Sequence, residues 1–149
     1  MPAKTREPFF HRLVMERPDI AVCRTAALFA RAAELQARAN RLGVGHHLVL
    51  RMLAVVGPCS QQTLSEELRI DRSVMVGIAE ELQKARYVSR ERNPEDRRAY
   101  RISLTEAGES ALFRAQGSVP KFLNDVFAPL TQAERDQFTQ LLVKILEID

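Results

Sequence analysis

The stretch that decides the fold is RNPEDRRAYRISLTEAG, residues 92–108. Its first ten residues hold four arginines, two acids and a turn-forming Asn-Pro pair. Residues 88–90 and 100–104 alternate apolar with polar side chains, the period of a strand with one buried face. We therefore predict a β-hairpin with its turn at residues 93–96. The charged tip is either a solvated turn or a finger that touches an anion.

Two short helices are predicted directly before this hairpin. Ser60 fits the N-cap of a helix that ends at Leu68. Asp71 fits the N-cap of the next helix, whose apolar stripe consists of Met75, Ile78, Ala79 and Leu82. Residues 69–71 are all that separates the two helices, and so short a connection is typical of a helix-turn-helix. A helix-turn-helix followed at once by a two-stranded hairpin is a winged helix.

The rest of the chain reads as helix. Before the helix-turn-helix we expect helices over residues 19–41, with Gly43 as the stop, and over residues 47–56, stopped by Gly57-Pro58. After the hairpin, Thr105 fits the N-cap of a long helical segment that runs to Val126 and is kinked at Gly117 and Pro120. A capping box at Thr131 and Glu134 opens a terminal helix. The predicted fold class is mainly α with a small β-hairpin wing: a winged helix-turn-helix flanked by N- and C-terminal helices. These flanking helices carry more apolar surface than one small core covers, which favours twofold pairing with a second copy of the chain.

The composition excludes several functional classes. A chain of 149 residues with 46% hydrophobic and 28% charged residues is one globular domain. No apolar run approaches the roughly 20 residues of a membrane span, and the proline-broken N-terminus lacks the apolar core of a signal peptide, so we expect a cytoplasmic protein with no membrane partner. No glycine-rich phosphate loop, HExxH motif or plausible triad is present, so neither an enzyme nor a cofactor is predicted.

The positive charge is concentrated in one region. Residues 84–101 contain seven lysines and arginines against three acids, a balance of +4, whereas the whole chain carries +3. Charge runs are usually solvated faces. Here the clustering and the hairpin context favour an electrostatic footprint for phosphate.

The sequence resembles the MarR family of transcriptional regulators over nearly the whole chain, from about Asp19 to Ile148. The most specific part is DRRAYRISLTEAG, residues 96–108, and the segments LSEEL, DRS and LQK at residues 64–68, 71–73 and 82–84 support it. The resemblance implies one MarR-like domain over residues 1–149, with a DNA-binding lobe at about 45–104 and helical dimerisation regions at about 9–42 and 105–149. It also implies a homodimer that binds a pseudo-palindromic double-stranded operator, most often as a repressor, and is released by a small effector.

The resemblance places the helix from Arg72 to about Arg86 in the major groove, and the wing arginines in the minor groove or at its phosphates. Asp96 then braces the arginines, and the helix N-termini offer amides to phosphates. The implied DNA-binding residues are Ser60, Gln61, Arg72, Ser73, Val74, Val76, Gly77, Arg97 and Arg98.

The recognition helix departs from the family pattern, since Val76-Gly77 stands where a Thr-Arg pair is usual. We predict thin base readout, with Val74 or Val76 on a thymine methyl and Gly77 permitting close approach, so that affinity depends on the wing and the phosphates. Two family glycines are also replaced, by Arg69 and Arg86. Each is either an extra phosphate contact or a tolerated turn residue.

The effector site, for an aromatic or anionic small molecule, is expected between the first two helices and the DNA-binding lobe. Its candidate residues are Cys23, Ala27, His46, His47 and Leu50. Cys23 lies where peroxide sensors of the family keep a reactive thiol, but we favour two reduced, buried cysteines. His46 and His47 are ascribed to a polar rim or a helix cap rather than to a metal, because adjacent helical residues point about 100° apart.

Two other functions are consistent with the sequence. One is a thiol-based redox-sensing regulator that uses Cys23. The other is a winged-helix protein-interaction module with weakened DNA binding, which the Val76-Gly77 replacement favours.

Overall fold

A computed structural model of the chain describes residues 8–96, 99–117 and 119–147. The predicted fold class is confirmed: the chain is mainly helical, with one two-stranded antiparallel sheet. The elements are α1 (Phe9–Glu16), α2 (Pro18–Asn40), α3 (Val44–Val56), α4 (Gln61–Glu67), α5 (Arg72–Lys84), β1 (Val88–Arg92), β2 (Tyr100–Leu104), α6 (Glu106–Gln116), α7 (Val119–Val126) and α8 (Gln132–Ile145).

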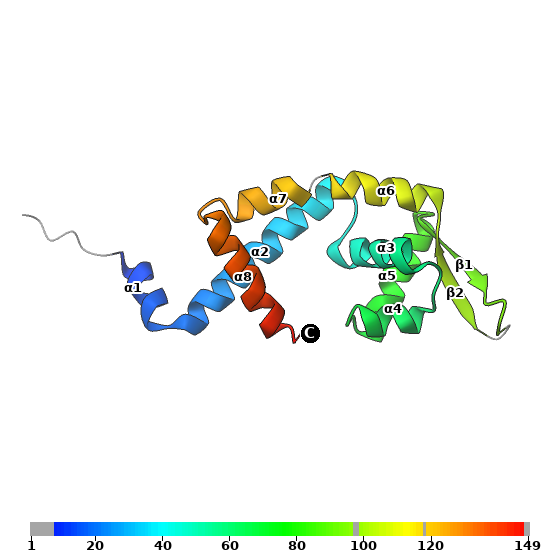
Figure 1. The fold of residues 1–149 in the computed structure, drawn as a ribbon, viewed down its shortest axis with the longest axis horizontal. Helices are drawn as coiled ribbons and strands as arrows, with labels where there is room; N and C mark the ends of the chain where they lie inside the picture. Colours follow the sequence, from blue (N-terminus) through cyan, green and yellow to red (C-terminus); the bar gives the residue numbers. More distant parts are fainter. Residues whose placement is uncertain (1–7, 97–98, 118, 148–149) are drawn as a thin grey trace, which may run out of the picture.

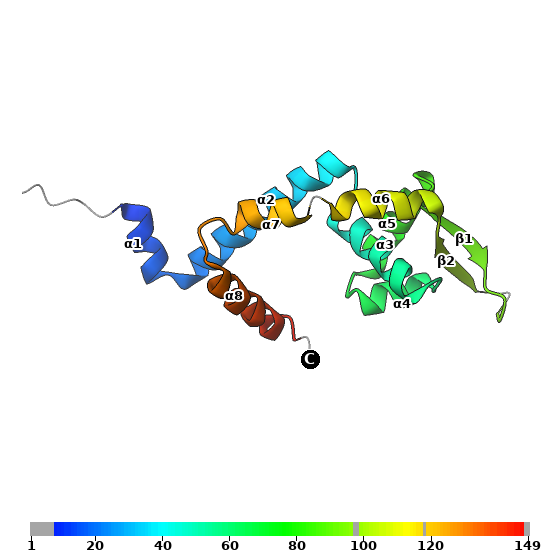
Figure 2. The same cartoon turned by 45° about the horizontal axis from the view of Figure 1, so that its top comes forward.

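The molecule is elongated (Figure 1), with α3, α4, α5 and the hairpin gathered at one end and α1 at the other. Helices α2 and α7 run side by side between the two ends, and α8 folds back toward α4. The view turned by 45° shows the same arrangement (Figure 2). The division at about residues 45 and 105 into a DNA-binding lobe and dimerisation regions stays a prediction.

The hydrophobic core lies where α3, α5, the hairpin and α6 meet. Its largest fully buried side chains are Val49, Leu50, Leu64, Met75 and Leu82. The stripe predicted for α5 is buried as expected, since Met75, Ile78, Ala79 and Leu82 are at most 8% exposed. This core fixes α5 against the hairpin, so the outward faces of both are held in one relative position.

The predicted helix caps are confirmed. The side chains of Ser60, Asp71 and Thr105 each accept a hydrogen bond from a backbone amide in the first turn of the helix that follows, at 3.0, 2.8 and 3.1 Å. Thr131 and Glu134 form the full capping box. Each cap satisfies an amide that would otherwise lack a partner, and therefore fixes where its helix begins.

The hairpin pairs Val88 with Leu104 and Arg92 with Tyr100, so β1 is two residues longer than predicted. The Asn93 side chain accepts from the amide of Glu95 at 3.1 Å and stabilises the predicted turn. Cys59 exchanges two backbone hydrogen bonds with Ile102, at 3.2 and 2.8 Å. These two bonds attach the loop before α4 to the edge of the hairpin.

Three helix boundaries differ from prediction. Helix α2 ends at Asn40 because Arg41, not Gly43, adopts the left-handed conformation, with φ 54°. Gly43 is instead the extended N-cap of α3, which therefore begins at Val44 rather than His47. The predicted long segment is two helices, α6 and α7, and the first ends at Gly117.

The corner between α7 and α8 is held by an aromatic cluster and one arginine. The rings of Phe29, Phe127 and Phe138 stack edge to face, with centroids 5.7–6.0 Å apart. The Arg135 guanidinium donates to the carbonyls of Leu130 and Phe127 and to the side chain of Asn124. These contacts attach the first half of α8 to α2.

Candidate nucleic-acid interface

The outward face of α5 carries the residues that the sequence proposed for DNA contact. Arg72, Ser73, Val74 and Val76 are exposed, with Val74 at 54% and Val76 at 44%, and Gly77 is half-buried. No heavy atom lies within 4 Å of the position that a β-carbon of Gly77 would occupy. The glycine is therefore not required by packing, and the surface around it is open to a ligand.

The start of α5 is fixed by Asp71. Its carboxylate accepts from the amide of Ser73 at 2.8 Å and from the Ser73 hydroxyl at 2.5 Å. These bonds, the one to the hydroxyl first, lower the pKa of Asp71 below its usual range. Arg72 lies 3.6 Å from the carboxylate of Glu66 on α4. The bond to Asp71 thus orients the Ser73 hydroxyl, whose oxygen can still accept a hydrogen bond.

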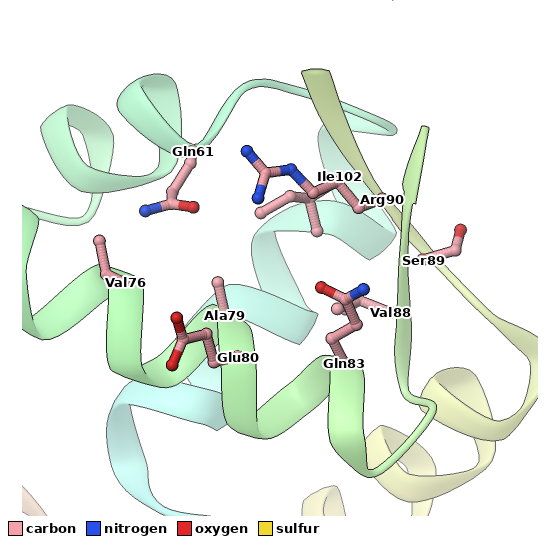
Figure 3. Close-up of a pocket in the computed structure, with 9 residues that line it drawn as sticks. All are labelled: Gln61, Val76, Ala79, Glu80, Gln83, Val88, Ser89, Arg90 and Ile102. Carbon is pink, nitrogen blue, oxygen red and sulfur yellow. The ribbon is translucent and has the colours of Figure 1, made fainter. Parts of the chain in front are cut away.

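A cavity of about 200 Å³ separates α5 from the hairpin. In Figure 3 the Gln61 amide, the Arg90 guanidinium and the Val76 side chain point into this space, with the Glu80 carboxylate beside it. The lining residues are Gln61, Val76, Ala79, Glu80, Gln83, Val88, Ser89, Arg90 and Ile102. The lining combines apolar side chains with hydrogen-bonding groups, as in sites that take a ligand with both kinds of surface.

Arg90 and Arg92 are held over one aromatic ring. Their guanidinium carbons lie 4.6 and 5.3 Å from the centroid of the Tyr100 ring. Tyr100 is 41% exposed, so its ring supports the two arginines at the surface rather than packing in the core. The strand period would have identified both, because residues 88, 90 and 92 share the face of the hairpin that turns toward α5.

The remaining candidates are distributed as follows. Arg97 and Arg98 lie outside the described residues. The backbone carbonyl of Asp96 accepts from the amide of Ala99 at 2.9 Å, and the bracing role of its carboxylate stays a prediction. The hydroxyl of Ser60 is engaged by Thr63 within α4, at 3.0 Å from its amide and 2.9 Å from its hydroxyl.

A second, more apolar cavity of about 260 Å³ lies between α2, α3, α6 and α7. It is lined by Ala33, Gln36, Ala37, Leu42, Gly43, Val44, His47, Ala115, Phe122 and Leu123. Of the five residues predicted for an effector site, His47 alone lines this cavity. The cavity lies further along α2 than Cys23 and Ala27, and the effector site stays a prediction.

The other four effector candidates lie elsewhere. Cys23 and Ala27 are exposed on α2, so the expectation of two buried thiols is wrong for Cys23. Leu50 is fully buried in the core, and Nε2 of His46 lies 2.7 Å from a carboxylate oxygen of Glu81 on α5. Among the described residues, no group of three or more His, Cys, Asp or Glu side chains is placed to hold a metal ion.

Acidification should destabilise the fold through His47. Burial lowers its pKa from the usual value, and the positive charge of Arg51 lowers it further. The unfolded chain therefore binds the extra proton first, and stability falls as the pH drops from about 6.5 through the folded pKa. Urea unfolding across this range should show that His47→Gln removes much of the slope. An unchanged slope in the variant would contradict the assignment.

Residues 42–99 match the sequence profile of the MarR family. A proposed transcriptional regulatory protein for the hcr operon of Thauera aromatica is 30% identical over 105 residues, which are 70% of this chain and 63% of that protein. The chain belongs to the MarR family. The HTH-type regulator PrsX of Escherichia coli is 32% identical over 58% of this chain and 52% of its own length. The chain thus matches between about half and two thirds of the length of these MarR-type relatives.

The fold is also similar to solved structures of MarR-family proteins. The structure of Bordetella bronchiseptica BpsR, a protein whose DNA binding is regulated by 6-hydroxynicotinic acid, superposes with a TM-score of 0.75 at 22% identity. The match covers 87% of this chain and 98% of that one. MarR-family proteins are transcriptional regulators that bind DNA, and the winged helix is their fold. Within the described part of the chain, no helix is long and apolar enough to span a membrane.

Proposed function

We propose that the protein is a homodimeric repressor that binds a pseudo-palindromic operator, with α5 of each copy in a major groove and each wing at the adjacent minor groove. The observation that carries the proposal is the exposed face of α5 beside a wing whose Arg90 lines the cavity next to it. A helix of this length fits the major groove, and guanidinium groups suit phosphates and narrow minor grooves.

We propose that a sugar-phosphate strand of the operator passes along the cavity between α5 and the wing. Two adjacent grooves of a duplex are separated by one such strand, so a protein that enters both must accommodate it between the two elements. Arg90 and Gln61 supply donors there, and the Tyr100 ring limits the rotamers of Arg90 before binding. The arginine missing from position 77 of the recognition helix is thus offset by one that projects from the wing.

The homodimer is supported by unpartnered apolar side chains on the flanking helices. Phe9 and Met15 on α1 are 68% and 72% exposed, Val22 on α2 is 68% exposed, and Ile145 on α8 is 74% exposed. The structure has no described buried residue on either α1 or α8. A second copy of the chain that covers these faces would bury them, as closed twofold assemblies do.

In vitro selection from random duplex DNA tests the proposal, with the mass of the complex measured in parallel. The expected result is an inverted repeat whose half-sites lie about 10 bp apart, centre to centre, bound by two chains. Affinity should fall steeply with salt because several phosphates are neutralised. Failure to enrich any sequence, with no salt-dependent binding, would favour the protein-interaction module instead.

Gly77→Ala should stabilise the protein and weaken DNA binding. The added methyl group meets no neighbouring atom, and alanine favours a helix over glycine by about 1 kcal/mol. If the backbone at Gly77 approaches the DNA, the same methyl group stands in the interface. Thermal unfolding and shift assays measure the two effects separately. A more stable variant with unchanged affinity would place Gly77 outside the interface.

The apolar cavity beside His47 is the proposed effector site. Its lining favours a small aromatic ring, and His47, neutral at pH 7, offers one hydrogen bond. The aromatic acid that regulates BpsR is a suitable first probe in a screen of aromatic acids. We expect Ala33→Phe, which fills the cavity, to abolish the thermal shift caused by any active compound while DNA affinity is retained. A shift that survives the substitution would locate the effector elsewhere.

A further inference from the structure

One arginine joins the turn of the helix-turn-helix to the end of the chain. Nη1 of Arg69 donates to the carbonyl of Leu146 at 2.7 Å, and Nη2 donates to the carbonyl of Glu147 at 3.3 Å. These partners are 77 and 78 residues from Arg69 in the sequence. The end of α8 lies beside α4 in both views of the whole chain (Figures 1 and 2).

Arg69 occupies a conformation that glycine adopts more readily. Its φ is 51°, and Arg86 after α5 has a φ of 60°. At such a φ the β-carbon is crowded by the backbone, so glycine would be the more favourable residue in both turns. The two therefore share one backbone conformation, and the bonds to α8 distinguish Arg69 from Arg86.

The contact is chemically well matched. The last carbonyls of a helix have no partner within the helix, and they form the negative end of its dipole. Leu146 is the C-cap of α8, and a guanidinium presents several donors in a plane. The aromatic cluster holds the first half of α8, so Arg69 provides its second attachment, at the other end.

We propose that Arg69 is a positioning residue that sets the distance between the recognition helix and α8. Given the dimer proposed above, α8 belongs to the interface between the copies, because Leu141, Ile145 and Leu146 are exposed on it. The turn that carries Arg69 leads directly into α5. The contact thus fixes how far apart the two recognition helices lie, and with it the half-site spacing that the protein accepts.

The coupling is measurable without DNA. Spin labels at Lys84→Cys on α5 and Gln140→Cys on α8, in a Cys23→Ser, Cys59→Ala background, report the distance between the two helices. Dilution with unlabelled chain removes signals between copies. We expect one narrow distance distribution, which broadens in Arg69→Ala and not in the matched control Arg86→Ala. A distribution unchanged by Arg69→Ala, or broadened equally by both, overturns the proposal.

The second readout is operator spacing, which rests on the proposed function. The unaltered protein is first used to select an operator, and binding is then compared on duplexes with base pairs added or removed between the half-sites. We expect the unaltered protein and Arg86→Ala to lose binding on altered spacings, while Arg69→Ala retains it. Equal selectivity of Arg69→Ala and the unaltered protein would overturn the spacing role. If the unaltered protein selects no DNA, the proposed function fails, and the distance measurement still decides the coupling.

Discussion

Replacing Gly108 by alanine is expected to remove a large part of the stability of the fold. A β-carbon at this position would lie 2.1 Å from the carbonyl oxygen of Tyr87 and 2.7 Å from a methyl group of Leu104. The carbonyl cannot rotate away, because it accepts from the amide of Thr105 at 3.1 Å, and the Thr105 hydroxyl donates to the carbonyl of Arg86 at 2.7 Å. Overpacking against fixed backbone costs about 3 kcal/mol. Urea unfolding followed by circular dichroism measures the loss.

The matched control is Gly77→Ala, since it adds the same methyl group to a helix where nothing lies within 4 Å. The two alanine variants should therefore shift the unfolding midpoint in opposite directions. Retention of full stability in Gly108→Ala would show that α6 can move off the hairpin. The helix-turn-helix core would then not depend on this junction.

The elements of the winged helix were predictable because their signals are local. Caps such as Asp71 and Thr105 act within one turn of their own helix, and the charged hairpin is specified by residues adjacent in sequence. The boundary at Arg41 was not predictable in this way. An arginine in a left-handed conformation carries no sequence signal, because tertiary packing overrides its preference.

The lining of the two cavities was likewise not predictable from local sequence signals. Their walls are assembled from helices far apart in sequence, so Phe122 and Ala33 could not be placed together before the fold was known. Arg90 is different: its position in the strand was predictable, and only its ring partner required the structure. The elements of the winged helix were therefore predictable from local patterns, whereas the lining of both cavities required the structure.

We expect Arg90→Ala to weaken operator binding by about 10- to 100-fold, because a hydrogen bond to a charged group contributes about 1.5–3 kcal/mol. The slope of log affinity against log salt should fall by about 0.9 if one phosphate contact is lost. Val76→Ala, which removes only methyl contact, should cost less than about 1 kcal/mol. Arg98 lies outside the described residues, and we expect Arg98→Ala to weaken operator binding far more than Val76→Ala. Arg114→Ala on α6 is the control for loss of charge, with binding unchanged.

Substitutions of Tyr100 test whether the wing arginines act through a fixed position or only through their positive charge. Tyr100→Phe keeps the ring under Arg90 and Arg92 and should retain binding, whereas Tyr100→Leu removes the ring that orders Arg90 and should weaken binding several-fold. The salt slope should stay unchanged in Tyr100→Leu, because the number of phosphate contacts is the same and only their ordering cost rises. If Val76→Ala weakens binding more than Arg90→Ala, base readout by α5 dominates, and the proposed compensation by the wing is wrong.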